Sequence, residues 1–417
     1  MLYYLFEYLK EVFGDFPGSG LFQFLSFRAG MAISVALLIS VIWGDRIISS
    51  LKSLQIGESV RDLGLAGQNE KSGTPTMGGV IIILAVVIPV LLFSKLDSIY
   101  IRLLLISILW MGMIGAVDDW IKVFKKNKAG LHGKFKILGQ IVLGLLVGGV
   151  MFWHSEITVR LDYNDAVALN VPIHNTLVDT LVDETVKEYA YVRTGLTNVP
   201  FFKENNFNYR SLVFFSDDKD KWYWVFYIPF VIFLITAVSN AANLTDGLDG
   251  LASGVSAIIV GALVLFAYLS SNSRFSEYLN ILFLPQSQEL VIFSASLVGA
   301  CVGFLWYNSY PAKVFMGDTG SLALGGVIAT LMIVLRKEFL IPILCGIFVL
   351  ENFSVVLQVS YFKYTKRKYG EGRRIFRMSP IHHHFQKLGM HEAKIVTRFW
   401  IVGVLLAIAA IITLKVR

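Results

Sequence analysis

The chain has 417 residues, of which 55% are hydrophobic and 16% are charged, and its mean hydropathy is +0.63. This composition excludes an ordinary soluble domain and is typical of a polytopic membrane protein. The net charge of +7 does not indicate a nucleic-acid-binding protein, because the basic residues lie between apolar segments, where cytoplasmic loops carry them.

Apolar segments long enough to cross a membrane recur along the chain. A bilayer requires roughly 20 apolar residues per helix, and lipid leaves backbone groups no partner outside the helix itself. We therefore predict an all-α polytopic membrane protein, with residues 1–20 as either a short interfacial helix or a frayed terminus. The ten predicted spans are residues 23–43, 77–94, 99–117, 135–153, 222–242, 251–270, 289–306, 320–336, 338–360 and 396–415.

The distribution of charge predicts the sidedness of the connecting loops. Lysines and arginines cluster in the third loop, at residues 122–136, and in the ninth, at residues 363–377, so the odd-numbered loops should be cytoplasmic and both termini non-cytoplasmic. The fourth connection, residues 154–221, is acidic and is predicted to be an extracytoplasmic insertion. The chain, residues 1–417, is then a single transmembrane domain.

Adjacent carboxylates, Asp118 and Asp119, close the third span. Carboxylates at a membrane boundary suit magnesium, which binds one or two aspartates together with phosphate oxygens. The alternative is that they only mark the end of a helix and are neutralised by Lys122 one turn later. The motif alone leaves both interpretations open.

The fifth and seventh loops repeat this pattern at two further boundaries. Residues 240–250 place amides, a hydroxyl and two carboxylates among glycines, which is more polar groups than a helix N-cap needs and favours a ligand site. In residues 306–321, Asp318 either caps the next helix or completes a cation site. Phe315 is compatible with stacking on a nucleobase and with anchoring at the interface.

The first and ninth loops offer groups that bind anions. Residues 71–79 combine a lysine and three hydroxyls before a helix, although the lysine precedes the glycines and so does not form a Walker A loop. Residues 382–384 are three histidines, whose side chains on a helix would point about 100° apart and so suit phosphate contacts better than one zinc ion. The preceding basic run, residues 363–374, is interpreted as an anchor to anionic lipid headgroups.

Together these motifs resemble those of the polyprenyl-phosphate N-acetylhexosamine-1-phosphate transferase superfamily, and the three histidines point to its phospho-N-acetylmuramoyl-pentapeptide transferase branch. The resemblance is carried by residues 71–79, 118–119, 243–250, 316–318 and 380–384. It implies transfer of phospho-MurNAc-pentapeptide from UDP-MurNAc-pentapeptide to undecaprenyl phosphate, with release of UMP, in the inner membrane of a bacterium and on its cytoplasmic face. Residues 155–221 lie outside this resemblance and are assigned no catalytic role.

The resemblance also implies roles for individual residues. It implies Mg²⁺ as cofactor, with Asp318 and Asp246 as metal ligands. The residues implied to be catalytic are Asp118, Asp119, Asp318 and His383. The residues implied to bind substrate are Lys71, Thr76, Lys122, Lys134, Asn243, Asp246, Asn308, Phe315, Gly317, His382 and His384. The lipid phosphate is largely ionised near neutral pH, which favours its direct attack over a phospho-enzyme.

Several alternatives stay open at this point. The nearest is an N-acetylglucosamine-1-phosphate transferase on the same scaffold, which the accepted UDP-sugar would distinguish. A transporter of lipids or sugars, or a membrane scaffold, would not need to transfer a sugar phosphate. The shortage of charged residues within the spans argues against a transporter. Glu351, the main exception, marks either a break in the ninth span that lines a lipid groove or polar packing between helices. The oligomeric state is not determined, and a homodimer is compatible with the sequence.

Overall fold

The computed structural model describes residues 1–15, 17–54, 73–125, 127, 129–169, 171–180, 186–202 and 205–415. Within this part of the chain, eight helices are long and apolar enough to cross a membrane, and a bent helix pair makes a ninth. The predicted all-α polytopic class is therefore confirmed. Nine of the ten predicted spans correspond to α2 (Leu25–Leu54), α4 (Ile99–Phe124), α5 (Gly133–Trp153), α8 (Trp224–Thr245), α9 (Leu251–Ser271), α11 (Gln288–Asn308), α12 (Gly317–Val334), the bent pair and α16 (Glu392–Ile412). The second predicted span, residues 77–94, is α3 (Gly79–Phe93), an apolar helix of 15 residues that is shorter than the others, and α2 extends beyond the predicted end at residue 43.

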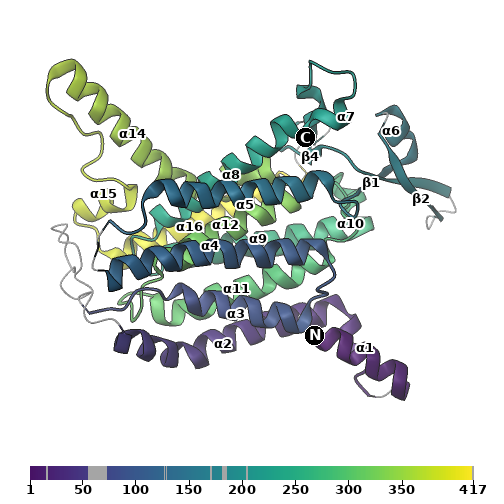
Figure 1. Cartoon of the computed structure of the whole chain (residues 1–417), viewed down its shortest axis with the longest axis horizontal. Coiled ribbons are helices and arrows are strands. Elements are labelled where there is room, and N and C mark those ends of the chain that lie inside the picture. Colours follow the sequence, from purple (N-terminus) through teal and green to yellow (C-terminus); the bar gives the residue numbers. More distant parts are fainter. Residues whose placement is uncertain are drawn as a thin grey trace.

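The ninth predicted span is not one straight helix. It comprises η4 (Glu338–Leu340) and α13 (Ile341–Leu344), followed by α14 (Gly346–Tyr369), and the two halves are bent by 78°. The break lies at Cys345, before Glu351 rather than at it. After the break, α14 leads away from the other helices and reaches beyond the bundle, as Figure 1 shows.

Helix α12 occupies the centre of the bundle and packs against α4, α8 and α3. Small residues on its neighbours allow this close approach. A Cβ added at Gly79 of α3 would lie 2.1 Å from the backbone nitrogen of Gly320, and one at Gly115 of α4 would lie 2.1 Å from the carbonyl oxygen of Asp318. Because the obstructing atoms are backbone, only glycine permits these helices to meet the first turn of α12 so closely.

The two ends of the bundle differ. The short helix α15 (Ile381–Lys387) and the outer half of α14 lie at one end, here called the site end. Strand β1 (Val159–Asp162), strand β2 (Ile173–Thr180) and helix α7 (Lys219–Trp222) lie at the opposite end, here called the insertion end (Figure 1).

The long fourth connection folds into short elements of its own. Its antiparallel three-stranded sheet has the order β1-β3-β2, with Leu161 of β1 paired to Ala190 of β3 (Val186–Val192). A second antiparallel pair is formed by β4 (Leu196–Asn198) and β5 (Asn206–Asn208). The remaining elements are α6 (Tyr163–Ala168), η3 (Tyr209–Leu212) and α7, while α10 (Ser273–Leu279) follows α9. The insertion therefore adds strands to an otherwise helical protein.

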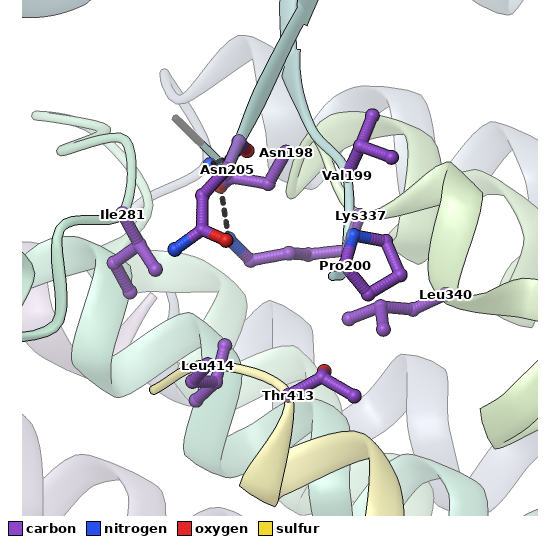
Figure 2. Close-up of a pocket in the computed structure, with 9 residues that line it drawn as sticks. All are labelled: Asn198, Val199, Pro200, Asn205, Ile281, Lys337, Leu340, Thr413 and Leu414. Atoms are coloured by element: carbon purple, nitrogen blue, oxygen red, sulfur yellow. Dashed lines mark hydrogen bonds between the residues drawn. The ribbon is translucent and has the colours of Figure 1, made fainter. Parts of the chain in front are cut away.

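The insertion is fixed to the bundle by buried polar contacts just beyond α12. The backbone N–H of Asn198 donates to the carbonyl of Arg336 at 3.0 Å, and the hydroxyl of Tyr209 donates to Glu338 Oε1 at 3.0 Å. Lys337, which is fully buried, donates its Nζ to Asn198 Oδ1, and burial lowers the pKa of its ammonium to about 7. Figure 2 shows Lys337 reaching across a cavity of about 20 Å³, room for one water molecule.

Both ends of the described chain lie at the insertion end. Helix α1 (Leu2–Phe13) is formed, as the interfacial-helix interpretation requires, and the Met1 ammonium donates to the carbonyl of Leu91 at 2.6 Å. η1 (Leu21–Gln23) follows it. At the other terminus, Lys415 Nζ donates to the carbonyl of Tyr278 at 2.7 Å. The insertion and both termini thus share one end, and the face of the membrane to which that end belongs stays a prediction.

Candidate active site

The first and seventh loops meet at the start of α12. The backbone N–H of Phe315 donates to the carbonyl of Pro75 at 2.9 Å, and the N–H groups of Gly78 and Gly79 donate to the carbonyls of Phe315 and Met316 at 2.8 and 2.9 Å. This pairing holds two loops that are far apart in sequence in one layer at the site end.

Three carboxylates converge beside this layer. Oxygens of Asp118, Asp119 and Asp318 all lie within 4.8 Å of one another. The first two are buried at the end of α4, and Asp318 lies in the first turn of α12, where Gly115 permits its approach. The expected convergence of aspartates from separate helix ends is present.

Asp119 is held by the backbone of α12. Its Oδ1 accepts from the N–H of Asp318 at 3.1 Å, and its Oδ2 accepts from the N–H and the hydroxyl of Thr319 at 2.9 and 2.7 Å. The two N–H donors lie in the first turn of α12, where backbone N–H groups have no partner within the helix. Asp119 therefore fixes the position of Asp318 as well as contributing charge.

Two lysines neutralise much of the carboxylate charge. Lys136 Nζ lies 3.0 Å from Asp118 Oδ1 and 2.5 Å from Asp318 Oδ2. Lys122 Nζ pairs with Asp118 and lies 3.2 Å from Asp318 Oδ1. The pairing of Lys122 with Asp118 expected for a simple helix end is thus real, but it belongs to a larger cluster that reaches α5 and α12.

Lys136 is a site residue in the position expected for Lys134. The side chain of Lys134 is exposed at the start of α5. The buried face of α5 includes Gln140, Leu143 and Val147, and Lys136 precedes Gln140 by one helical turn. Helical periodicity was therefore the signal that distinguishes Lys136 from Lys134.

The fifth loop contributes Asn243 and Asp246 to the same region. Asn243 Nδ2 donates to Asp318 Oδ1 at 3.0 Å and to Ser321 Oγ at 2.9 Å. Burial, followed by the neighbouring charges of Asp318 and Asp119, raises the pKa of Asp246 to about 8. In the described part of the chain, Asp246 lies beside the group of three close carboxylates rather than within it.

Asn308 ties the fifth and seventh loops together. It is buried, its Nδ2 donates to the carbonyl of Val314 at 3.0 Å, and its Oδ1 accepts from the N–H of Gly250 at 3.1 Å and from the Ser253 hydroxyl at 3.0 Å. These protein partners show how Asn308 organises the loops; its predicted contact with substrate stays a prediction.

Three other predicted binding residues surround the turn before α12. Gly317 has a φ of +71°, and a Cβ there would lie 2.6 Å from Asp119 Oδ2 and 2.7 Å from Thr76 Oγ1, so glycine is required. Thr76 is buried, whereas the side chain of Phe315 is partly exposed. Lys71 lies outside the described residues.

The three histidines lie on the seven-residue helix α15 and have different partners. His382 is fully buried, with Nδ1 3.0 Å from Glu351 Oε2. His383 Nδ1 lies 2.7 Å from Gln386 Oε1, and His384 Nδ1 accepts from the backbone N–H of Arg377 at 3.1 Å. The histidines therefore point to separate surroundings, as expected for a helix. Of the two interpretations of Glu351, the structure shows polar packing between helices.

This arrangement can hold an anionic ligand that carries a divalent cation. Carboxylate oxygens are ligands for the cation, while the ammonium groups of Lys122 and Lys136 can shift to phosphate oxygens. Such a combination of positioning and charge neutralisation is what phosphoryl transfer requires.

Comparison with known proteins agrees with this chemistry. The family model of glycosyl transferase family 4 matches residues 190–336, and the phospho-N-acetylmuramoyl-pentapeptide-transferase signature 1 matches residues 71–83. The chain is 57% identical to the phospho-N-acetylmuramoyl-pentapeptide-transferase of Flavobacterium psychrophilum, 55% identical to that of Flavobacterium johnsoniae and 53% identical to that of Parabacteroides distasonis, with 100% of each chain covered.

These alignments span the whole chain, so residues 155–221, which were expected to lie outside the resemblance, are within the region shared with these relatives. Identity at this level over the full length establishes the family. The chain belongs to the phospho-N-acetylmuramoyl-pentapeptide-transferase family.

Proposed function

We propose that the protein transfers phospho-MurNAc-pentapeptide from UDP-MurNAc-pentapeptide to undecaprenyl phosphate and releases UMP. The observation that carries this proposal is the cluster of Asp118, Asp119 and Asp318 with Lys122 and Lys136, in a chain of this family. The product is the first lipid intermediate of peptidoglycan synthesis. A bacterial inner membrane, with the site end facing the cytoplasm, is the location that this reaction requires.

The donor set fits Mg²⁺. Magnesium prefers oxygen ligands and is commonly bound by one or two carboxylates plus substrate phosphates. Asp318 and Asp118 are the residues that would hold it, because both pair with lysine ammonium groups that a phosphate can also accept from, whereas both oxygens of Asp119 accept hydrogen bonds from α12. When bound, the ion supplies positive charge to the diphosphate oxygens. Asp246, with its elevated pKa, is a further ligand candidate only once a cation lowers that pKa.

The lysines supply the other half of the electrostatics. Lys136 and Lys122 bridge the same carboxylates from α5 and α4, so an arriving diphosphate places its oxygens next to two ammonium groups that are already oriented. An oxygen of the lipid phosphate then bonds to the sugar-bearing phosphorus. The bond from that phosphorus to the bridging oxygen breaks, and the bridging oxygen leaves with UMP.

This step needs no strong general base. A phosphate monoester has a second pKa of about 6, so the lipid phosphate is largely ionised at neutral pH and carries no proton that must be removed. We therefore propose direct attack. His383 and His384 are proposed to contact the sugar-phosphate part of the donor, and Asn243 and Phe315 to line its nucleoside part.

The experiment is magnesium-dependent UMP release by the purified protein supplied with UDP-MurNAc-pentapeptide and undecaprenyl phosphate. We expect release with this donor, little with UDP-N-acetylglucosamine, and loss of release in Asp318→Asn. Preference for UDP-N-acetylglucosamine would assign the alternative sugar-1-phosphate transferase activity, and near-normal turnover by Asp318→Asn would remove Asp318 from the mechanism. Movement of an intact lipid without UMP release would indicate a transporter.

A further inference from the structure

A buried pair of polar side chains lies beneath the fifth loop and has no role in the mechanism above. Glu351 of α14 and His382 of α15 are both fully buried, and Glu351 Oε2 lies 3.0 Å from His382 Nδ1. Burial of two such groups costs free energy that is recovered only when they are hydrogen-bonded. Because His382 packs against Gly247 of the fifth loop, this cost falls next to the site.

The other ring nitrogen of His382 is buried without a hydrogen-bond partner among the described residues. It faces the Asp246–Gly247 turn of the fifth loop, because a Cβ added at Gly247 would lie 2.3 Å from Nε2. An unpartnered buried nitrogen is rare in folded proteins and calls for an explanation. Here it is aimed at the turn that carries Asp246, whose charge interacts with Asp318 and Asp119.

The geometry points to Glu351 as the positioning residue for His382. A carboxylate can only accept hydrogen bonds, so Glu351 places the proton on Nδ1 and leaves the buried Nε2 facing the Asp246–Gly247 turn. The imidazole thereby fixes the turn at which the ligand, the UDP-sugar donor, is held. The inference rests on the proposed transferase function for the identity of the ligand, but not for the Glu351–His382 arrangement.

The same contact explains why residue 247 is glycine. Any side chain there would collide with the imidazole, so the ring and the turn fix each other's position. Glu351 therefore acts on the site indirectly. It holds the imidazole of His382, and the imidazole supports the Asp246–Gly247 turn. Partners that orient metal-ligating histidines change activity by about 10–100-fold when they are removed, and we expect an effect of that size here.

The first test is kinetic and uses a double-mutant cycle. We expect Glu351→Leu to lower the kcat of UMP release about 10–100-fold, and Glu351→Gln, which keeps an acceptor oxygen, to restore much of the loss. In a His382→Ala background, Glu351→Leu should cost nothing further, because its effect passes through His382. Equal losses in both backgrounds, or full activity of His382→Ala, would overturn the inference.

Ser354→Ala is the matched control. Ser354 is buried on the same helix, and its hydroxyl donates to the backbone carbonyl of Glu351 at 2.7 Å rather than to the carboxylate. Its turnover should match that of the unmodified protein. A loss in Ser354→Ala as large as that in Glu351→Leu would show a general packing effect and overturn the positioning role.

The second test does not depend on activity. The protein has seven histidines, and ¹⁵N-histidine labelling with His382→Ala for assignment reports which ring nitrogen carries the proton. We expect His382 protonated at Nδ1 in the unmodified protein and in Glu351→Gln, and a mixture of tautomers in Glu351→Leu. A proton on Nε2 alone, with Nδ1 unprotonated, would overturn the inference. Absence of UMP release together with the expected tautomer would instead refute the proposed function and leave the arrangement standing.

Discussion

At the scale of single residues, the structure separates two lysines that the sequence presents as equivalent. Lys134 and Lys136 lie in the same basic loop, yet only Lys136 reaches Asp118 and Asp318. Lys134 is exposed. The difference arises because each step along a helix turns the side chain by about 100°. Two steps separate Lys134 from Lys136, so the two side chains point to nearly opposite sides of α5 and only Lys136 faces the carboxylates.

This difference predicts the behaviour of a matched pair of variants. Lys136→Met should lower the kcat of UMP release by about 100- to 1,000-fold, as loss of one oriented donor to developing charge does elsewhere. Lys134→Met removes the same charge from the same loop and should change kcat little. Initial rates of UMP release at saturating magnesium would test this prediction. A larger loss of kcat in Lys134→Met than in Lys136→Met would contradict the assignment of Lys136 to the site.

At the scale of elements, the site depends on how closely α4 approaches α12. Gly115 faces backbone atoms of Asp318 and Thr319, whereas Gly112, one turn earlier on α4, faces the side-chain tip of Ile83, with a Cβ-to-Cδ1 distance of 2.5 Å. A side-chain tip can move aside, but a helix backbone cannot without shifting the whole element. The two glycines therefore differ in what their substitution disturbs.

Gly115→Ala should displace the first turn of α12 and lower turnover about 100-fold, since a shift of about 1 Å in a reacting group has effects of that size. Gly112→Ala should lower thermal stability without a comparable loss of turnover. Paired measurements of kcat and melting temperature in detergent would test this. Equal turnover in the two variants would show that the spacing of α4 and α12 does not control the site.

A second element-scale prediction concerns the contact between the insertion and the bundle. Burial lowers the pKa of Lys337 to about 7 in the folded protein, against about 10.4 in an unfolded chain. Between these values the unfolded chain binds a proton that the folded protein does not, so the free energy of unfolding rises with pH across roughly pH 7–10. Below that window both states are protonated, and above it neither is.

Lys337→Met should remove this dependence. We expect the melting temperature of the unmodified protein to increase relative to that of Lys337→Met as the pH is raised from 7 to 10. Asn198→Ala, which removes the acceptor of the Lys337 amine but leaves the amine buried, should keep a pH dependence. Parallel stability profiles for the unmodified protein and Lys337→Met would show that Lys337 is charged in the folded state.

At the scale of the whole molecule, the site and the insertion occupy opposite ends of the bundle (Figure 1). The basic loops lie at the site end and the acidic connection at the other, so the charge distribution predicts that the site end faces the cytoplasm. The two natural cysteines are both buried and should give little background in labelling experiments.

Single cysteines at exposed positions of each end test this orientation. In intact spheroplasts, Thr176→Cys in the insertion should react with an impermeant thiol reagent, whereas Arg374→Cys near α15 should react only after the membrane is opened. Labelling of both from outside would refute the arrangement of the two ends on opposite faces. The reversed pattern would place the site outside the cytoplasm.

The sequence by itself determined the membrane class, the approximate position of the apolar spans and the polar motifs that mark the site. These features are local: a run of about 20 apolar residues crosses a bilayer whatever its neighbours are, and a boundary aspartate is visible wherever a run ends. The resemblance of those motifs to the transferase family could likewise be recognised from the sequence, and the comparisons confirm it.

Only the tertiary structure decided which polar residues act together. Lys136 and Asp318 are 182 residues apart in sequence, and Glu351 meets His382 across two helices. Nor could hydropathy locate the break at Cys345, because both halves of that span are apolar enough to pass for one helix. Such pairings are set by helix packing, which depends on where glycines let backbones approach rather than on any single segment's composition.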